Sequence, residues 1–152
     1  MKLLTQICLF LVLLLSADCL AQRPSPWESL RESQIQQNVP NEDQFEQILH
    51  RDLKSHFARK HPKLSIVEIF LFRKQATVSG LSSPKFYLWA EGLDEEGNSL
   101  FEAATRVAAA AKKEFFVLNY LYKDEINEEP DKVKSIFPKA LVQSVLECAS
   151  KP

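Results

Sequence analysis

The sequence predicts an α+β domain in which one long N-terminal helix packs on a curled antiparallel sheet of about four strands, with one or two C-terminal helices after it. Three observations lead to this fold class. Apolar side chains recur every three or four positions within residues 41–61, as on one face of a helix. Residues 64–122 then alternate aromatic and β-branched segments with turn residues. Helical spacing of apolar residues returns after residue 138.

Residues 1–21 are predicted to be a signal peptide. Lys2 supplies the basic start, residues 7–15 form an apolar run too short to span a membrane, and the segment ends in a small residue. Cys19 offers a second interpretation, a bacterial lipoprotein acylated on that cysteine. Because Asp18 stands where lipoprotein signals carry a small residue, we favour cleavage after residue 21 and export without a lipid anchor.

The charge of the chain is nearly balanced, with 19 Lys and Arg against 20 Asp and Glu and a net charge of −1. Lys2 and Asp18 are the only charged residues of the signal peptide, so its removal keeps this balance. A chain without a basic stripe lacks the feature that grips nucleic acid or a membrane surface, and we expect neither partner. No later stretch is long and apolar enough for stable insertion into a bilayer.

Cys148 is the only cysteine that remains after the predicted cleavage, so no internal disulfide can form. A buried, inert thiol is favoured over an intermolecular disulfide. The sequence after residue 21 also lacks an Asn-x-Ser/Thr glycosylation sequon. Secreted animal domains of this size more often carry disulfides or glycans, so we expect an exported protein, periplasmic or secreted, with the bacterial periplasm favoured.

Residues 22–40 are predicted to be a polar leader ahead of a single domain at residues 41–152. The motif Ser25-Pro26-Trp27-Glu28 combines an N-cap, a proline at the first helical position and a capping-box glutamate. It predicts a short helix to about residue 36, and a flexible leader is the alternative. If Trp27 and Leu30 pack, the leader belongs to the domain; if they do not, it is a tether or a partner-binding segment.

The long helix is predicted to begin after Asn41, which is a suitable N-cap, and to end before Pro62. One apolar stripe follows this helix, which therefore needs a surface to cover. The stripe consists of Phe45, Ile48, Leu49, Leu53 and Phe57.

Strands are predicted at residues 64–72, 85–93 and 114–122, and a hairpin loop at residues 94–98. Residues 100–111 are ambiguous, because their alanines favour helix whereas apolar residues at every second position favour a strand. The hairpin loop before this segment and the strong strand after it lead us to predict a strand, with the next tight turn at Lys112-Lys113.

The C-terminal part is predicted to be helical and to be interrupted at Pro138, which must break or restart a helix. The last helix has an apolar stripe of its own. It consists of Leu141, Val142, Val145, Leu146 and Ala149.

The alternation along the strands predicts a second sheet face that is both aromatic and polar. The candidate residues of this face for binding a ligand or partner are Tyr87, Trp89, Glu102, Arg106 and Asn119. Left bare, the face would exceed the apolar patch that soluble monomers expose, so the C-terminal helix, a second copy of the chain or a ligand must cover it. The alternative is that Glu102 and Arg106 pair with neighbouring strands under the C-terminal helix.

No pattern in the sequence predicts a catalytic residue, a cofactor or a metal ion. His50 and His61 are too far apart on one helix to bind the same ion, and no zinc-binding spacing occurs. His56 and Asp52 have the spacing of an acid–base pair on a helix, and a pair without chemistry is the favoured interpretation.

Roughly residues 41–122, a helix followed by an antiparallel meander, resemble the cystatin-like and nuclear-transport-factor-like α+β folds. The stretch Gln75-Ala76-Thr77-Val78-Ser79-Gly80 is similar to the inhibitory Gln-x-Val-x-Gly hairpin of cystatins, with one inserted residue. The second cystatin wedge, a Pro-Trp pair, is replaced by Lys112-Lys113.

Three functions remain in view. We expect an exported, non-catalytic binding domain whose mixed sheet face binds a small ligand or a protein partner, or joins two copies in a homodimer. The cystatin resemblance implies as an alternative a protease inhibitor that acts through Gln75, Val78 and Gly80. The nuclear-transport-factor resemblance implies a small pocket enzyme with His56 or Glu102 in an open sheet face.

Overall fold

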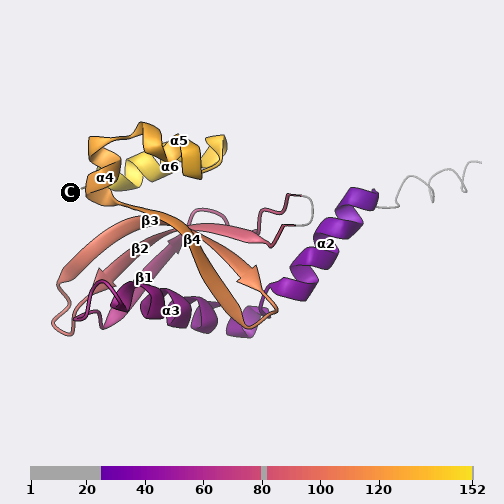
Figure 1. The fold of residues 1–152 in the computed structure, drawn as a ribbon, viewed down its shortest axis with the longest axis horizontal. Helices are drawn as coiled ribbons and strands as arrows, with labels where there is room; N and C mark the ends of the chain where they lie inside the picture. The colour runs from indigo at the N-terminus through magenta and orange to yellow at the C-terminus, as the bar shows by residue number, and fades with distance from the viewer. Residues whose placement is uncertain (1–24, 80–81, 152) are drawn as a thin grey trace, which may run out of the picture.

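The computed structural model describes residues 25–79 and 82–151. The predicted signal peptide and Gly80 lie outside these residues. The described residues form an α+β fold with five helices and a four-stranded antiparallel sheet, as the sequence predicted at this level (Figure 1). The elements are α2 (Pro26–Asn38), α3 (Glu42–Ala58), β1 (Ile66–Leu71), β2 (Lys85–Leu93), β3 (Ser99–Ala110), β4 (Glu114–Tyr122), α4 (Lys123–Glu128), α5 (Asp131–Ile136) and α6 (Lys139–Ala149).

The sheet is a simple meander in which each strand pairs with the next, in the order β1-β2-β3-β4. The ambiguous segment 100–111 is a strand, as predicted, because β3 spans Ser99–Ala110 and is paired on both sides. The register shifts at Gly92/Leu93 and at Arg106/Val107, and such bulges bend a sheet and increase its twist.

One face of the sheet is covered by α3 (Figure 1). The stripe residues Leu49, Leu53 and Phe57 are fully buried there and meet strand residues such as Phe101 and Phe115. The bounds differ from the prediction, since α3 ends at Ala58 rather than at residue 61, and Asn41 makes no side-chain cap bond. The helix is shorter because its last turn tightens before Pro62: Lys60 N and His61 N both donate to Phe57 O.

The opposite face carries three C-terminal helices (Figure 1), where the sequence predicted one or two. The additional helix, α4, begins directly after β4, where Tyr122 N donates to Glu125 Oε2. Pro138 separates α5 from α6, as expected from a residue that lacks a backbone donor. Ile126, Val133 and Val145 of these helices are fully buried against the sheet. The C-terminal helices therefore supply the cover that the second face required.

Two helices precede the sheet, the long helix α3 and the short helix α2, which was one of the two interpretations of the leader. The predicted start of α2 is confirmed, because Glu28 N donates to Ser25 Oγ and Ser25 N donates to Glu28 Oε2, as in a capping box. No residue of α2 is buried, and the helix projects from the body (Figure 1). Its C-terminal end is anchored by Asn38, whose backbone oxygen accepts from Lys112 N and whose Oδ1 accepts from Ala111 N.

Candidate functional site

The aromatic residues predicted for the mixed sheet face lie beneath the C-terminal helices. Tyr87 is 5% exposed and Trp89 is 8% exposed. The Tyr87 ring lies 5.8 Å from that of Phe137, centroid to centroid, and burial raises the pKa of the Tyr87 hydroxyl. Both side chains belong to the packed layer between sheet and helices.

The polar residues of the same face pair with their surroundings, as the alternative interpretation expected. Glu102 accepts a hydrogen bond from Trp89 Nε1 at 3.2 Å and binds Lys123 Nζ at 2.7 Å. Arg106 donates from Nη1 to the backbone oxygen of Ile136 at 3.2 Å. Asn119 is half-buried opposite Arg106 on the next strand. The structure thus brings all five candidates together on the face that the C-terminal helices cover.

Arg106 retains one unsatisfied group, because its Nε is buried and has no hydrogen-bond partner in the described part of the chain. An unpaired buried donor is unfavourable. Through the bond to Ile136, the Arg106 guanidinium links β3 to the C-terminal end of α5.

The three histidines of α3 and its C-terminal end face different surroundings. His50 Nδ1 lies 2.8 Å from the backbone oxygen of Val67. His61 Nε2 lies 3.1 Å from the Tyr122 hydroxyl, and burial together with the Lys60 cation lowers the pKa of His61. His56 packs edge-on against Phe57, and burial lowers its pKa.

The predicted pair of His56 and Asp52 is not formed. The Asp52 carboxylate accepts from Phe115 N at 2.7 Å and from Arg51 Nε at 2.8 Å, which occupies both oxygens. Asp52 therefore fastens α3 to the start of β4. Within residues 25–79 and 82–151, no group of His, Cys, Asp and Glu is arranged to hold a metal ion.

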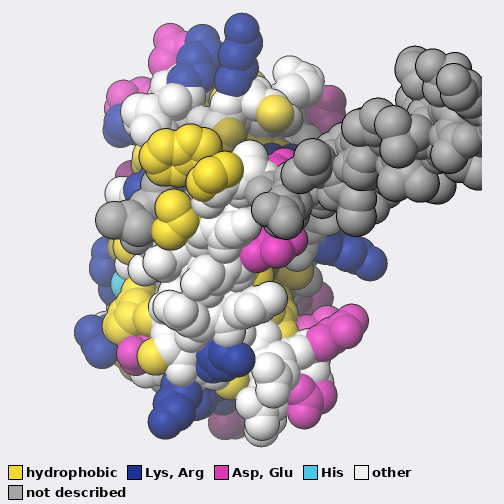
Figure 2. Space-filling model, turned by 90° about the vertical axis from the view of Figure 1, so that its right-hand side faces the viewer, with side chains coloured by type: hydrophobic (Ala, Val, Ile, Leu, Met, Phe, Trp, Pro, Cys, Tyr) yellow, Lys and Arg dark blue, Asp and Glu magenta, His cyan; other side chains and the backbone are white. Residues whose placement is uncertain are grey.

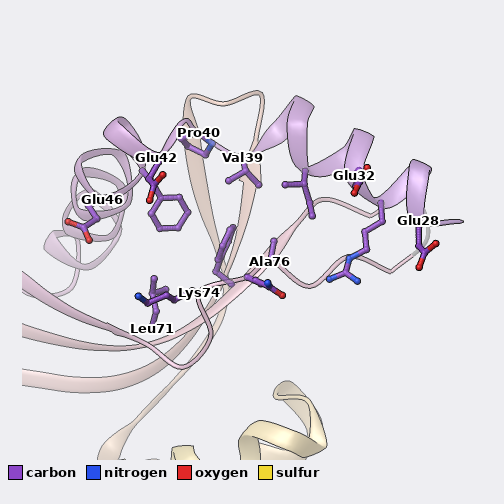
Figure 3. Close-up of a pocket in the computed structure, with 14 residues that line it drawn as sticks. Glu28, Glu32, Val39, Pro40, Glu42, Glu46, Leu71, Lys74 and Ala76 are labelled. Atoms are coloured by element: carbon purple, nitrogen blue, oxygen red, sulfur yellow. The ribbon is translucent and has the colours of Figure 1, made fainter. Parts of the chain in front are cut away.

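A cleft of about 800 Å³ opens between α2, the start of α3 and the end of β1 (Figure 3). Its walls combine an apolar floor with charged groups at the rim. The apolar residues are Ile35, Val39, Pro40, Phe45, Leu71, Ala76 and Phe86. The charged residues are Glu28, Glu32, Glu42, Glu46, Arg31 and Lys74. Figure 3 shows Glu28 and Glu32 on α2 and Glu42 and Glu46 on the α3 side of the cleft.

Sequence reasoning missed this cleft, although one signal was present. Each of the two helices carries a pair of glutamates four residues apart, Glu28 with Glu32 and Glu42 with Glu46. Such like-charged pairs destabilise a helix by about 0.2–0.5 kcal/mol each. Their placement around one cleft depends on the angle between α2 and α3, which the sequence pattern does not encode.

The residues of the predicted inhibitor hairpin lie next to this cleft. Gln75 is exposed and lines it, and Ala76 is buried in its floor. Val78 is half-buried and lines a smaller hollow of about 250 Å³ that Arg31 of α2 also lines. Thr77 is held by backbone bonds in both directions with Lys85.

Exposed hydrophobic residues mark the side from which α2 projects, and Figure 2 shows hydrophobic side chains at the surface there. Trp27 is 75% exposed and Leu30 is 40% exposed, both on α2. Neither side chain is buried, which is the case in which a tether or a partner-binding segment is expected from the sequence.

Cys148 is a free, half-buried thiol in the C-terminal layer, and burial raises its pKa. This environment fits an unreactive cysteine. None of the helices in the described residues is both long and apolar enough to cross a membrane.

Comparisons of the chain with models of protein families, with curated proteins and with solved structures found no match.

Proposed function

We propose that this protein is an exported, non-catalytic binding domain, and that a protein partner binds to α2 and the cleft beside it. The observation that carries the proposal is the state of α2. It is a 13-residue helix with a complete capping box and no buried residue, and it forms one wall of an apolar cleft. Ile35 packs partly against the core, whereas the first half of α2, with Trp27 and Leu30, is exposed and gains little stability from its own domain.

The exposed surface of Trp27 is large enough to contribute strongly to binding. A tryptophan buries about 150–250 Å² on complete removal from water, and three quarters of Trp27 is open. At about 25 cal/mol per Å², burial of this open part contributes about 3–5 kcal/mol, the range of an interface hot spot. Leu30, one turn further along α2, extends the same apolar contact.

The charge of the rim favours a basic partner. Four carboxylates and two cations line the cleft, so its field is negative. The two glutamates of each pair repel each other, and a cationic group bound in the cleft reduces that repulsion. A segment with an apolar side chain for the floor and Lys or Arg beside it fits both features.

The covered sheet face agrees with a binding domain better than with a pocket enzyme. An enzyme of the nuclear-transport-factor-like type requires an open, concave face with His56 or Glu102 inside it. Glu102 instead pairs with Trp89 and Lys123, and His56 lies on α3 against Phe57. We propose that Tyr87, Trp89 and Arg106 serve binding indirectly, by holding the C-terminal layer in place.

Protease inhibition is a second candidate, favoured by one observation. Gln75 and Val78 lie at the same end of the molecule as α2 and line hollows that α2 shares. If this candidate holds, the protein inhibits papain and Val78→Asp removes the inhibition, whereas Trp27→Ala leaves it unchanged. Papain activity that is unaffected by a large excess of the protein rules the candidate out.

Panning a random-peptide display library on the purified protein tests the first proposal. We expect enriched peptides that combine Lys or Arg with an aromatic or aliphatic residue. Trp27→Ala and the double variant Glu32→Gln/Glu46→Gln should each weaken their binding by at least about tenfold. Phe116→Ala, at a residue that is 50% exposed on β4, is the matched control for Trp27.

The double variant Glu95→Gln/Glu96→Gln is the matched control for the rim, because both residues are exposed in the β2–β3 loop. A higher salt concentration should weaken the binding of these peptides, because it screens the charges at the rim of the cleft. Peptides that bind the variants and the native protein equally well would place the working surface elsewhere.

A further inference from the structure

The free edge of β1 has open hydrogen-bonding groups at only one end. Within the described ranges 25–79 and 82–151, β1 is an edge strand that pairs only with β2. Phe72 N donates to Tyr87 O at 3.0 Å. By the alternation of antiparallel pairing, the backbone groups of Val67, Ile69 and Leu71 therefore point to the free edge. The Val67 oxygen is already engaged by His50 Nδ1 at 2.8 Å, which leaves those of Ile69 and Leu71.

The same end of β1 exposes a large hydrophobic side chain. Phe70 is 61% exposed, and its ring meets that of Phe72 edge-on at 5.8 Å. Ile66, which is 55% exposed, lies on the same sheet face, and the charged Glu68 stands between them. The C-terminal helices cover this face over β2 and β3, at Trp89 and Ala104, and leave β1 uncovered.

Natural proteins protect edge strands with charges or with side chains that block the backbone. Glu68 and the bond from His50 to Val67 protect one half of β1 in this way. The half formed by residues 69–71 has neither protection.

We propose that β1 pairs antiparallel with β1 of a second copy of this chain, about a twofold axis that places Phe70 opposite the second copy's Phe70. In this register the backbone N–H and C=O of Ile69 in each copy form hydrogen bonds with those of Leu71 in the other copy. Two aromatic rings then face each other across the axis, and such cross-strand pairs stabilise a sheet. The two four-stranded sheets become one continuous sheet of eight strands, twice the four of each copy.

Neighbouring registers are less favourable. Placing Ile69 opposite itself brings the Val67 oxygen into the ladder, where His50 already occupies it. It also sets Glu68 against Phe70. Placing Glu68 opposite itself sets two carboxylates face to face, which is destabilising.

Charge complementarity supports the same register. Glu68 lies towards one end of the segment, and Arg73 and Lys74 follow its other end. Antiparallel pairing brings the acidic end of each copy towards the basic end of the other. Glu68 then lies opposite Phe72 of the second copy, next to the position of Arg73 in the sequence.

The interface is small, so the dimer is reversible. About 60% of a phenylalanine corresponds to roughly 90–150 Å² of open surface per copy. Even with Ile66 and the strand backbone, the total stays below the roughly 1,200 Å² of stable complexes. Association is therefore expected at high micromolar protein concentrations.

Cysteine cross-linking tests the register. In a Cys148→Ser background, Phe70→Cys places a thiol opposite itself in a non-hydrogen-bonded pair, where side chains approach within disulfide reach. Under mild oxidation we expect it to form a covalent dimer at least tenfold faster than Glu68→Cys or Ile66→Cys. Fastest dimerisation of Glu68→Cys indicates the register that sets Glu68 against itself and overturns the proposal.

Sedimentation equilibrium from about 10 µM to 1 mM tests the dimer without an added thiol. The native protein and the control Phe116→Lys should associate equally, and Phe70→Lys should associate at least tenfold more weakly. A native protein that stays monomeric at 1 mM overturns the proposal and leaves the edge to a strand of some other protein. The display peptides should bind Phe70→Lys normally, so failure of the dimer and failure of the cleft proposal are separable.

Discussion

Replacing Lys112 with glycine should stabilise the protein, because Lys112 has a backbone conformation that suits glycine. Ala111 and Lys112 have φ angles of 50° and 60°. They form the tight turn between β3 and β4, in which Lys113 N donates to Ala110 O at 3.1 Å. This left-handed conformation costs a residue with a side chain about 1–2 kcal/mol. Glycine avoids that cost but loses more freedom on folding, about 0.5–1 kcal/mol.

The net gain expected for Lys112→Gly is about 0.5–1 kcal/mol, or a rise in Tm of about 1–4 °C for a chain of this size. The bond from the residue 112 backbone N to Asn38 O, at 2.9 Å, survives the change because it uses no side chain. Urea unfolding measures the gain as a higher midpoint at unchanged slope. Lys113→Gly is the matched control and should destabilise by about 0.5–1 kcal/mol, because Lys113 has no left-handed strain to relieve. Equal losses in both variants would refute the strain argument.

Three further predictions concern the anchor of α2, the two tryptophans and the histidines. Asn38→Ala removes the acceptor of Ala111 N and should speed proteolysis of α2 while lowering the unfolding free energy by about 0.5–1.5 kcal/mol; unchanged proteolysis contradicts the anchor. Trp89→Ala should cost about 3–5 kcal/mol in urea unfolding, whereas Trp27→Ala should stay within about 0.5 kcal/mol; similar losses contradict their burial. His56 and His61 have pKa values below that of the unfolded chain, so the folded state binds fewer protons and stability should fall as pH drops below about 6.5; the double variant His56→Gln/His61→Gln should flatten the unfolding profile between about pH 7.5 and 5.5.

Local signals in the sequence were sufficient for several elements. The capping box at Ser25 and Glu28 starts α2, and Pro138 divides α5 from α6, because each acts on backbone groups within one turn. The alanine-rich segment at 100–111 forms a strand because its alternation places Phe101 and Val107 in the core on the α3 side. Here the pattern of burial outweighs the helical preference of alanine.

Other features depend on how elements meet, which a local pattern does not determine. The turn between β3 and β4 was predicted at Lys112-Lys113 but centres on Ala111 and Lys112, because the ladder continues to Ala110 paired with Glu114. The long helix ended early, and the cleft arose from the angle between α2 and α3. An apolar stripe predicts that one side of a helix is buried, but the surface that buries it is determined by the assembled fold.

The two tryptophans differ in how far the fold covers them, and this difference is why the proposal rests on α2. Both are large aromatic side chains within a helix or strand. Trp89 lies in a strand with paired neighbours on both sides, Phe70 and Ala104, so any layer that seals the sheet also seals Trp89. Trp27 follows a proline at the start of a helix whose anchors, Ile35 and Asn38, lie near its other end, and it is 75% exposed among the described residues. An aromatic side chain is available to a partner when its own domain has no second element to place over it, and among the two tryptophans that condition holds for Trp27.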